Sequence, residues 1–133
     1  MMIVFVDTSA FYAVLDSDDA NHPAAKEVWT ALLREPATLL TTNYVLVETA
    51  ALLQRRIGVA AARTFHEDVA PLLQVHWISA EGHRAGMEAM LAAARKKLSL
   101  VDCVSFQTMR QYGVRTAFCF DAHFGEQGFV LKP

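Results

Sequence analysis

The chain is organised around residues 3–16, IVFVDTSAFYAVLD. The stretch begins with an apolar run at residues 3–6, which predicts a strand buried on both faces. The run stops at a carboxylate, Asp7. A helix follows at once, and the hydroxyl oxygens of Thr8 and Ser9 can accept hydrogen bonds from its free N–H groups. We therefore expect Asp7 at the carboxyl end of a central strand, where open α/β sheets place their ligand sites.

The composition is that of one folded domain. The chain has 133 residues, 53% of them hydrophobic, and a mean hydropathy of +0.23. A chain of this length buries roughly two-thirds of its unfolded surface, so we expect a single domain over residues 1–133 without a low-complexity linker. The opening residues, MMIVFVD, have neither the basic region of a signal peptide nor the apolar length of a membrane span. This predicts a cytoplasmic protein with no membrane partner.

Net charge and cysteine usage narrow the possible classes of protein further. The formal net charge is -2, so the molecule is not a polycation that binds nucleic acid through bulk electrostatics. Any nucleic acid must meet local patches such as residues 55–56 or 95–97, although each patch alone is more simply the solvated cationic end of a helix. Cys103 and Cys119 lie in apolar contexts without a CxxC or metal-ligand spacing, which predicts reduced core residues.

The rest of the chain alternates between strand and helix patterns. Further strands are expected at residues 38–42, 74–78, 116–120 and 129–131. Helices are expected at residues 24–34, 44–57, 80–97 and 99–113, with one or two more between 59 and 73. This order predicts a three-layer α/β/α domain around a central, mostly parallel sheet of four or five short strands.

Four acids occupy comparable places in these elements. Asp7 and Asp121 each follow a buried strand directly. Asp102 is the third residue of a helix that Ser99 can cap. Strand carboxyl ends and helix amino ends share one sheet edge when crossovers are right-handed, so these three acids are expected to converge. Glu48 lies on an apolar helix face without a basic neighbour three or four residues away, and it can reach the others if its helix follows the second strand.

The acids have both a structural and a chemical interpretation. Ser99 and Asp102 have the spacing of a capping box, which for an isolated motif is the favoured interpretation. Four converging carboxylates repel one another, however: at ~5 Å and an effective dielectric of ~20, each pair costs on the order of 3 kcal/mol. A cation must compensate, and oxygen ligands without a His or Cys cluster select Mg²⁺ or Mn²⁺. Such ions activate water and stabilise charge on a phosphodiester.

Four segments together resemble a known family. They are VDTSA at residues 6–10, NYVLVET at 43–49, LSLVDCVSF at 98–106 and FDAHF at 120–124. They are similar to the signature segments of PIN-domain ribonucleases and, within these, of the VapC-type toxins of toxin–antitoxin pairs. The resemblance covers nearly the whole chain, in order. It implies a PIN-like fold and a metal-dependent endoribonuclease that hydrolyses RNA by water attack and leaves a 5′-phosphate.

The resemblance also implies a site and partners. By position, Asp7, Glu48, Asp102 and Asp121 would be the catalytic acids that bind Mg²⁺ or Mn²⁺, with Asp7 and Asp102 the firmest metal ligands. Ser9 would be the hydroxyl that orients Asp7 or a metal-bound water. Related toxins form homodimers, act on RNA, and are silenced by a cognate VapB-like antitoxin whose carboxyl-terminal segment lies across the active-site groove.

Two positions depart from the family pattern, and other classes fit less well. Cys119 stands where relatives often have Thr or Ser, and Ala122 where a basic residue is common, which bears on the role of Asp121 and on substrate contacts. A receiver-type signalling domain needs adjacent acids after the first strand and an Asp after the third, which QVHWISAEG lacks. A haloacid-dehalogenase-like phosphatase needs an Asp where Ser9 stands. The alternative left open is a PIN fold that binds RNA or regulates without cleavage.

Overall fold

The computed structural model describes residues 2–133, and a five-stranded sheet with the order β3-β2-β1-β4-β5 forms its middle layer. Every neighbouring pair of strands is parallel. The strands are β1 (Met2–Val6), β2 (Ala37–Thr42), β3 (Gln74–His76), β4 (Thr116–Phe118) and β5 (Val130–Lys132). The expected sheet is thus confirmed, with parallel pairing throughout the described part of the chain.

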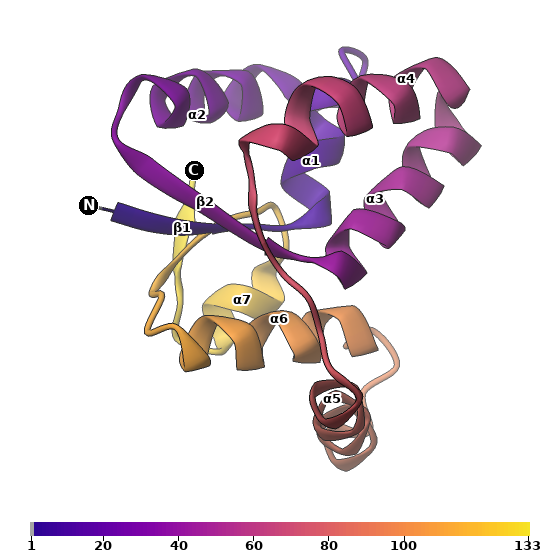
Figure 1. Ribbon diagram of the computed structural model, residues 1–133, viewed down its shortest axis with the longest axis vertical. Helices are drawn as coiled ribbons and strands as arrows, with labels where there is room; N and C mark the ends of the chain where they lie inside the picture. Colours follow the sequence, from indigo (N-terminus) through magenta and orange to yellow (C-terminus); the bar gives the residue numbers. More distant parts are fainter. Residues whose placement is uncertain (1) are drawn as a thin grey trace.

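Helices cover both faces of this sheet. They are α1 (Thr8–Leu15), α2 (His22–Arg34), α3 (Asn43–Arg56), α4 (Val59–Thr64), α5 (Ala80–Ala93), α6 (Leu100–Gln111) and α7 (Ala122–Glu126), with a π-helical segment (Phe65–Val69) and a 3-10 turn (Ala70–Leu72) after α4. Figure 1 shows α1 to α4 on one side of the sheet and α6 and α7 on the other, with α5 packed beyond α6. The three-layer prediction is confirmed. Among residues 2–133, no helix is both long and apolar enough to cross a membrane.

The central strand β1 is buried from both sides. Val4, Phe5 and Val6 are each 0% exposed. The ring centroid of Phe5 lies 6.2 Å from that of Phe124 in α7, so the sheet packs against the helical layer that contains α6 and α7. Burying a large apolar side chain contributes about 1.5–3 kcal/mol, so this core holds the strand firmly and fixes the position of Asp7, which follows it.

Several elements end earlier than the sequence predicted, among them β3, which was expected to reach residue 78 and ends at His76. The helix expected at residues 80–97 ends at Ala93, because Ala94 adopts a left-handed conformation (φ 52°) as the chain turns toward α6. The basic residues 95–97 therefore lie in a turn and not on a helix. The strand expected at residues 116–120 ends at Phe118, and the N–H of Phe120 donates to the hydroxyl of Ser9 instead of to a strand.

The carboxyl ends of β1 and β4 lie side by side at one edge of the sheet. Val6 of β1 is in register with Phe118 of β4, and the N–H of Asp7 donates to the carbonyl of Phe118 over 3.1 Å. Asp7 and Asp121 thus follow neighbouring strands at the same edge. The amino ends of α1, α6 and α7 lie at this edge as well, as the right-handed crossovers predicted (Figure 1).

Candidate active site

Asp7 caps α1 from the end of β1. Its Oδ2 accepts hydrogen bonds from the backbone N–H of Ser9 (3.2 Å) and from the hydroxyl of Ser9 (2.7 Å). We expected Thr8 and Ser9 to cap this helix, but the cap is the acid before them, because its extended backbone (φ -93°, ψ 161°) has the geometry of an N-cap. Asp7 is 4% exposed, and burial raises its pKa to about 7 although both hydrogen bonds favour the ionised form.

Two hydroxyls tie Asp7 and its helix to other elements. The hydroxyl of Ser9 donates to Asp7 and accepts a hydrogen bond from the N–H of Phe120 (2.9 Å), so it bridges the residues that follow β1 and β4. The hydroxyl of Thr8 accepts a hydrogen bond from the hydroxyl of Thr49 in α3 (3.3 Å). Ser9 therefore lies where it can orient the Asp7 carboxylate.

Asp102 and Asp121 each cap a helix with one carboxylate oxygen. Oδ2 of Asp102 accepts a hydrogen bond from the N–H of Ser99 (3.1 Å), and the hydroxyl of Ser99 accepts one from the N–H of Asp102 (3.0 Å), which completes the predicted capping box of α6. Oδ1 of Asp121 accepts a hydrogen bond from the N–H of His123 (2.9 Å) at the start of α7. Within residues 2–133, neither acid receives a hydrogen bond on its second oxygen, so capping leaves that oxygen available.

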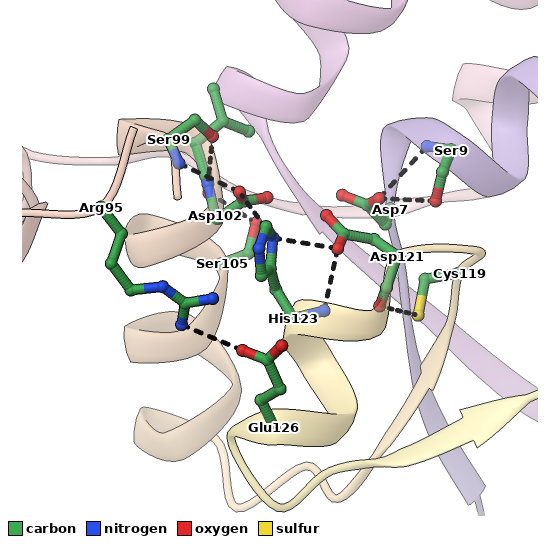
Figure 2. A network of polar contacts seen from close by, with 11 residues as sticks. Asp7, Ser9, Arg95, Ser99, Asp102, Ser105, Cys119, Asp121, His123 and Glu126 are labelled. Atoms are coloured by element: carbon green, nitrogen blue, oxygen red, sulfur yellow. Dashed lines mark hydrogen bonds and ion pairs between the residues drawn. The ribbon is translucent and has the colours of Figure 1, made fainter. Parts of the chain in front are cut away.

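His123 joins this group from the first turn of α7. Its Nδ1 lies 3.1 Å from Oδ1 of Asp121 and 3.8 Å from Oδ2 of Asp102. One ligand atom from each of these three residues lies within 4.8 Å of the other two. Figure 2 shows the carboxyl groups of Asp7, Asp102 and Asp121 directed toward one another, with the imidazole ring beside them.

The four predicted acids interact electrostatically. Burial is the largest cause of the raised pKa values of Asp7, Glu48 and Asp102. The charges of Glu48 and Asp102 raise the pKa of Asp7 further, and the charge of Asp121 raises the pKa of both Glu48 and Asp102. The structure therefore brings the four acids together, although Asp7 and Glu48 lie outside the compact group of Asp102, Asp121 and His123.

No Lys or Arg side chain between residues 2 and 133 neutralises this cluster. In the described part of the chain, no Lys or Arg forms an ion pair with any of the four acids. Arg95, drawn beside the cluster in Figure 2, pairs with Glu126 over 2.9 Å instead. The amino ends of α1, α6 and α7 supply partial positive charge, but each is equivalent to roughly half a unit charge. Of the described side chains, only His123 lies within ion-pair distance of these acids, and it can carry at most one positive charge against four carboxylates. The donor set, mostly carboxylate oxygens, therefore fits a divalent cation.

Sequence reasoning missed one member of the site, His123. It stands alone in the sequence, without a second His or Cys at a ligand spacing. The one available signal was its position two residues after an acid that ends a buried strand. In the folded chain, the turn that starts α7 brings the imidazole back onto the carboxylate of Asp121.

Comparisons with known proteins identify the family of the chain. A family model described as the PIN domain matches residues 4–130. The chain is 35% identical over 136 residues to the 23S rRNA-specific endonuclease VapC20 of Mycobacterium tuberculosis, and the alignment covers 98% of this chain and 99% of that protein.

Solved structures share the fold. The crystal structure of Mycobacterium tuberculosis VapC20, described as a Sarcin-Ricin loop cleaving toxin, matches with a TM-score of 0.85 at 34% identity, covering 96% of each chain. The structure of VapBC2 from Rickettsia felis, bound to a DNA fragment from their promoter, matches with a TM-score of 0.69 at 12% identity, over 98% of this chain and 97% of that one. At that identity, the second match shows the fold alone.

Proposed function

The chain belongs to the PIN-domain family and is a VapC-type nuclease, and from this premise we propose that it is a toxin that cuts ribosomal RNA with Mg²⁺ or Mn²⁺. One observation carries the assignment of the site. Four acids from four elements converge at the carboxyl edge of the sheet, where burial and mutual repulsion raise the pKa values of three of them. Burying several like charges together lowers the stability of the fold, and a bound ligand that carries positive charge would offset this cost.

The proposed metal ligands are the four acids that the sequence singled out. Asp102 and Asp121 would hold the ion most directly, since their ligand atoms lie closest together. Asp7 and Glu48 would complete the site, either directly or through water. A bound divalent ion would lower the pKa of a water molecule and stabilise the negative charge that develops on a phosphodiester.

The chain's own residues orient these acids and provide for proton transfer. Ser9 and Ser99 each fix one oxygen of a carboxylate, which holds the other oxygen of Asp7 and of Asp102 in a set direction. Glu48 is half-buried, and burial together with the charges of Asp102 and Asp121 raises its pKa. A carboxylate with a raised pKa is the better proton acceptor near neutral pH, so we assign Glu48 to accept a proton from the attacking water.

Ribosomal RNA is the proposed substrate class because the similar proteins carry that activity in their names. The exposed cationic residues 95–97 support contacts with RNA phosphates. They lie in the turn that leads into Ser99 and Asp102, next to the proposed site. A ribosomal substrate would place the activity in the cytoplasm.

The proposed protein partners are a VapB-like antitoxin and a second copy of the chain. An apolar cavity of about 310 Å³, lined by Tyr44, Val47 and Val101, lies directly beside Glu48. A second apolar cavity of about 240 Å³ also includes Val47 and extends along α3 to Phe65. This surface suits an apolar segment of an antitoxin that would cover the acids.

The test is cleavage of purified ribosomes by the purified protein. We expect one cut in 23S rRNA, within the sarcin–ricin loop, with a 5′-phosphate at the new end and none in 16S rRNA. Primer extension maps the cut, and parallel reactions contain Mn²⁺, Mg²⁺ or EDTA. Intact 23S rRNA in the presence of metal would reject the proposed substrate, and undiminished cleavage in EDTA would reject the metal site.

A further inference from the structure

We propose that His123 is a ligand of the divalent ion, so that its Nδ1 and the carboxylates of Asp102 and Asp121 hold the metal together. The inference rests on the proposed function, since it takes the bound ion as given. It adds a nitrogen donor to a site whose sequence pattern indicated oxygen donors alone. The three residues come from two adjoining helix starts, α6 and α7.

The distances fit one coordination sphere. Two ligand atoms that each lie about 2.1 Å from an ion, at right angles to each other, are about 3.0 Å apart. Nδ1 of His123 is 3.1 Å from Oδ1 of Asp121 and 3.8 Å from Oδ2 of Asp102. These two oxygens also cap α6 and α7, but a carboxylate oxygen has a second lone pair with which it can bind an ion. One ligand atom from each residue lies within 4.8 Å of the other two, so side-chain adjustments of about an ångström would bring all three residues onto one ion.

The Nδ1 atom also lacks a hydrogen-bond partner. Among the buried side-chain nitrogen and oxygen atoms of residues 2–133, it alone makes no hydrogen bond. The His123 side chain is 16% exposed. Its close approach to Oδ1 of Asp121 is not aligned as a hydrogen bond, and that oxygen already accepts one from the His123 backbone. Buried polar atoms in native proteins almost always make a hydrogen bond, so a ring nitrogen that makes none, and that lies within ion-pair distance of two carboxylates, is placed as a cation ligand would be.

The other histidines differ from His123 in this respect. Nδ1 of His22 is within hydrogen-bond distance of a backbone carbonyl, and those of His76 and His83 contact tyrosine hydroxyls. His66 is exposed to solvent. Only His123, among the described histidines, combines a buried nitrogen that makes no hydrogen bond with two neighbouring acids.

A nitrogen ligand changes which ion the site prefers. Imidazole suits first-row transition metals, whereas Mg²⁺ favours oxygen ligands in near-octahedral geometry. We therefore expect the site to bind Mn²⁺ more tightly than Mg²⁺, and to lose part of this preference when the imidazole is removed.

The experiment is pulsed electron paramagnetic resonance of Mn²⁺ bound to the full-length chain, which detects the ¹⁴N coupling of a ligated imidazole. The variants are His123→Gln, which replaces the ring by an amide, and His66→Gln as the matched control. We expect ¹⁴N modulation in the parent and in His66→Gln, and none in His123→Gln. By calorimetric titration, His123→Gln should weaken Mn²⁺ binding by about tenfold or more and Mg²⁺ binding by less.

The spectrum of the parent protein tests whether His123 binds the ion even if a variant folds poorly. Bound Mn²⁺ without nitrogen coupling in the parent, or coupling that persists in a folded His123→Gln, would overturn the inference. RNA cleavage measured on the same samples separates it from the proposed function. Nitrogen coupling without cleavage would support the histidine ligand and reject the nuclease, whereas cleavage without coupling would do the reverse.

Discussion

Replacing Asp7 by Asn should stabilise the metal-free protein while it disables the site. Asp7 is 4% exposed, and burial raises the pKa of its carboxyl from 3.8 to about 7. Asn cannot ionise, and its amide oxygen can accept the two hydrogen bonds that Ser9 donates to Asp7. The substitution therefore removes the cost of the buried charge and leaves the cap of α1 in place.

The sign and size of the effect follow from the two pKa values. The unfolded carboxyl loses its proton near pH 4 and the folded one near pH 7, so the folded state binds more protons in between. The stability of the parent protein therefore falls as the pH rises through this window. One pKa unit corresponds to about 1.4 kcal/mol, which makes the full cost about 4 kcal/mol above pH 7. We expect Asp7→Asn to be more stable by about 2–4 kcal/mol at pH 8, and by less than about 1 kcal/mol at pH 4.

The assay is urea denaturation in EDTA at pH 4 and pH 8. The matched control is Asp68→Asn, at an exposed aspartate of the π-helical segment, which should change stability by under about 0.5 kcal/mol at either pH. A buried, ionised Asp7 is excluded if Asp7→Asn is less stable than the parent at pH 8, or if the gain in stability is the same at both pH values. Either result would mean that Asp7 is not held ionised at a cost.

Three further predictions concern the Ser9 hydroxyl, the packing of α5 on α6 and the bound ion. Ser9→Ala should lower the free energy of unfolding by about 1–2 kcal/mol in urea titrations, because it removes a donor to Asp7 and an acceptor for the N–H of Phe120. Gly86→Ala should lower the free energy of unfolding by about 1–3 kcal/mol without changing the affinity for Mn²⁺, because the added Cβ would lie 2.6 Å from Cγ2 of Val104 and force α5 away from α6. Calorimetry measures both the stability and the affinity. Mn²⁺ at 100 times its dissociation constant should stabilise the parent by about 2.7 kcal/mol in thermal unfolding, and EDTA should abolish the gain.

The sheet and its acids could be predicted because their signals are local. A buried strand that ends in an acid appears twice in the sequence, before Asp7 and before Asp121, and the parallel pairing of β1 with β4 brings the two together. The capping box of Ser99 and Asp102 was also visible as a spacing. Its structural role and the proposed metal role do not exclude each other, because a carboxylate has two oxygens.

Element ends were harder to predict because they depend on contacts between distant segments. Ala94 ends α5 in a left-handed conformation, although alanine is a strong helix former and no glycine marks the site. Phe120 leaves the strand because the Ser9 hydroxyl, far away in sequence, accepts its N–H. Neither of these ends has a signature in the nearby residues.

His123 could not be found for a related reason. A lone histidine is usually a satisfied structural residue, and no ligand spacing distinguished this one from the others. What sets it apart is the missing partner of its Nδ1 and the two carboxylates that face it, and both exist only in the folded chain. Sequence patterns therefore predicted the acids of the site but not its nitrogen.

The most direct test of the central claim is the single-turnover rate of RNA cleavage by Asp102→Asn in Mn²⁺. Asp102 belongs to the compact ligand group, and Asn can keep the cap of α6 by accepting the Ser99 N–H. If the carboxylates hold the ion that cutting requires, the folded variant should cut RNA no faster than background, while Asp68→Asn should match the parent. Cleavage by Asp102→Asn at the rate of the parent would contradict the account.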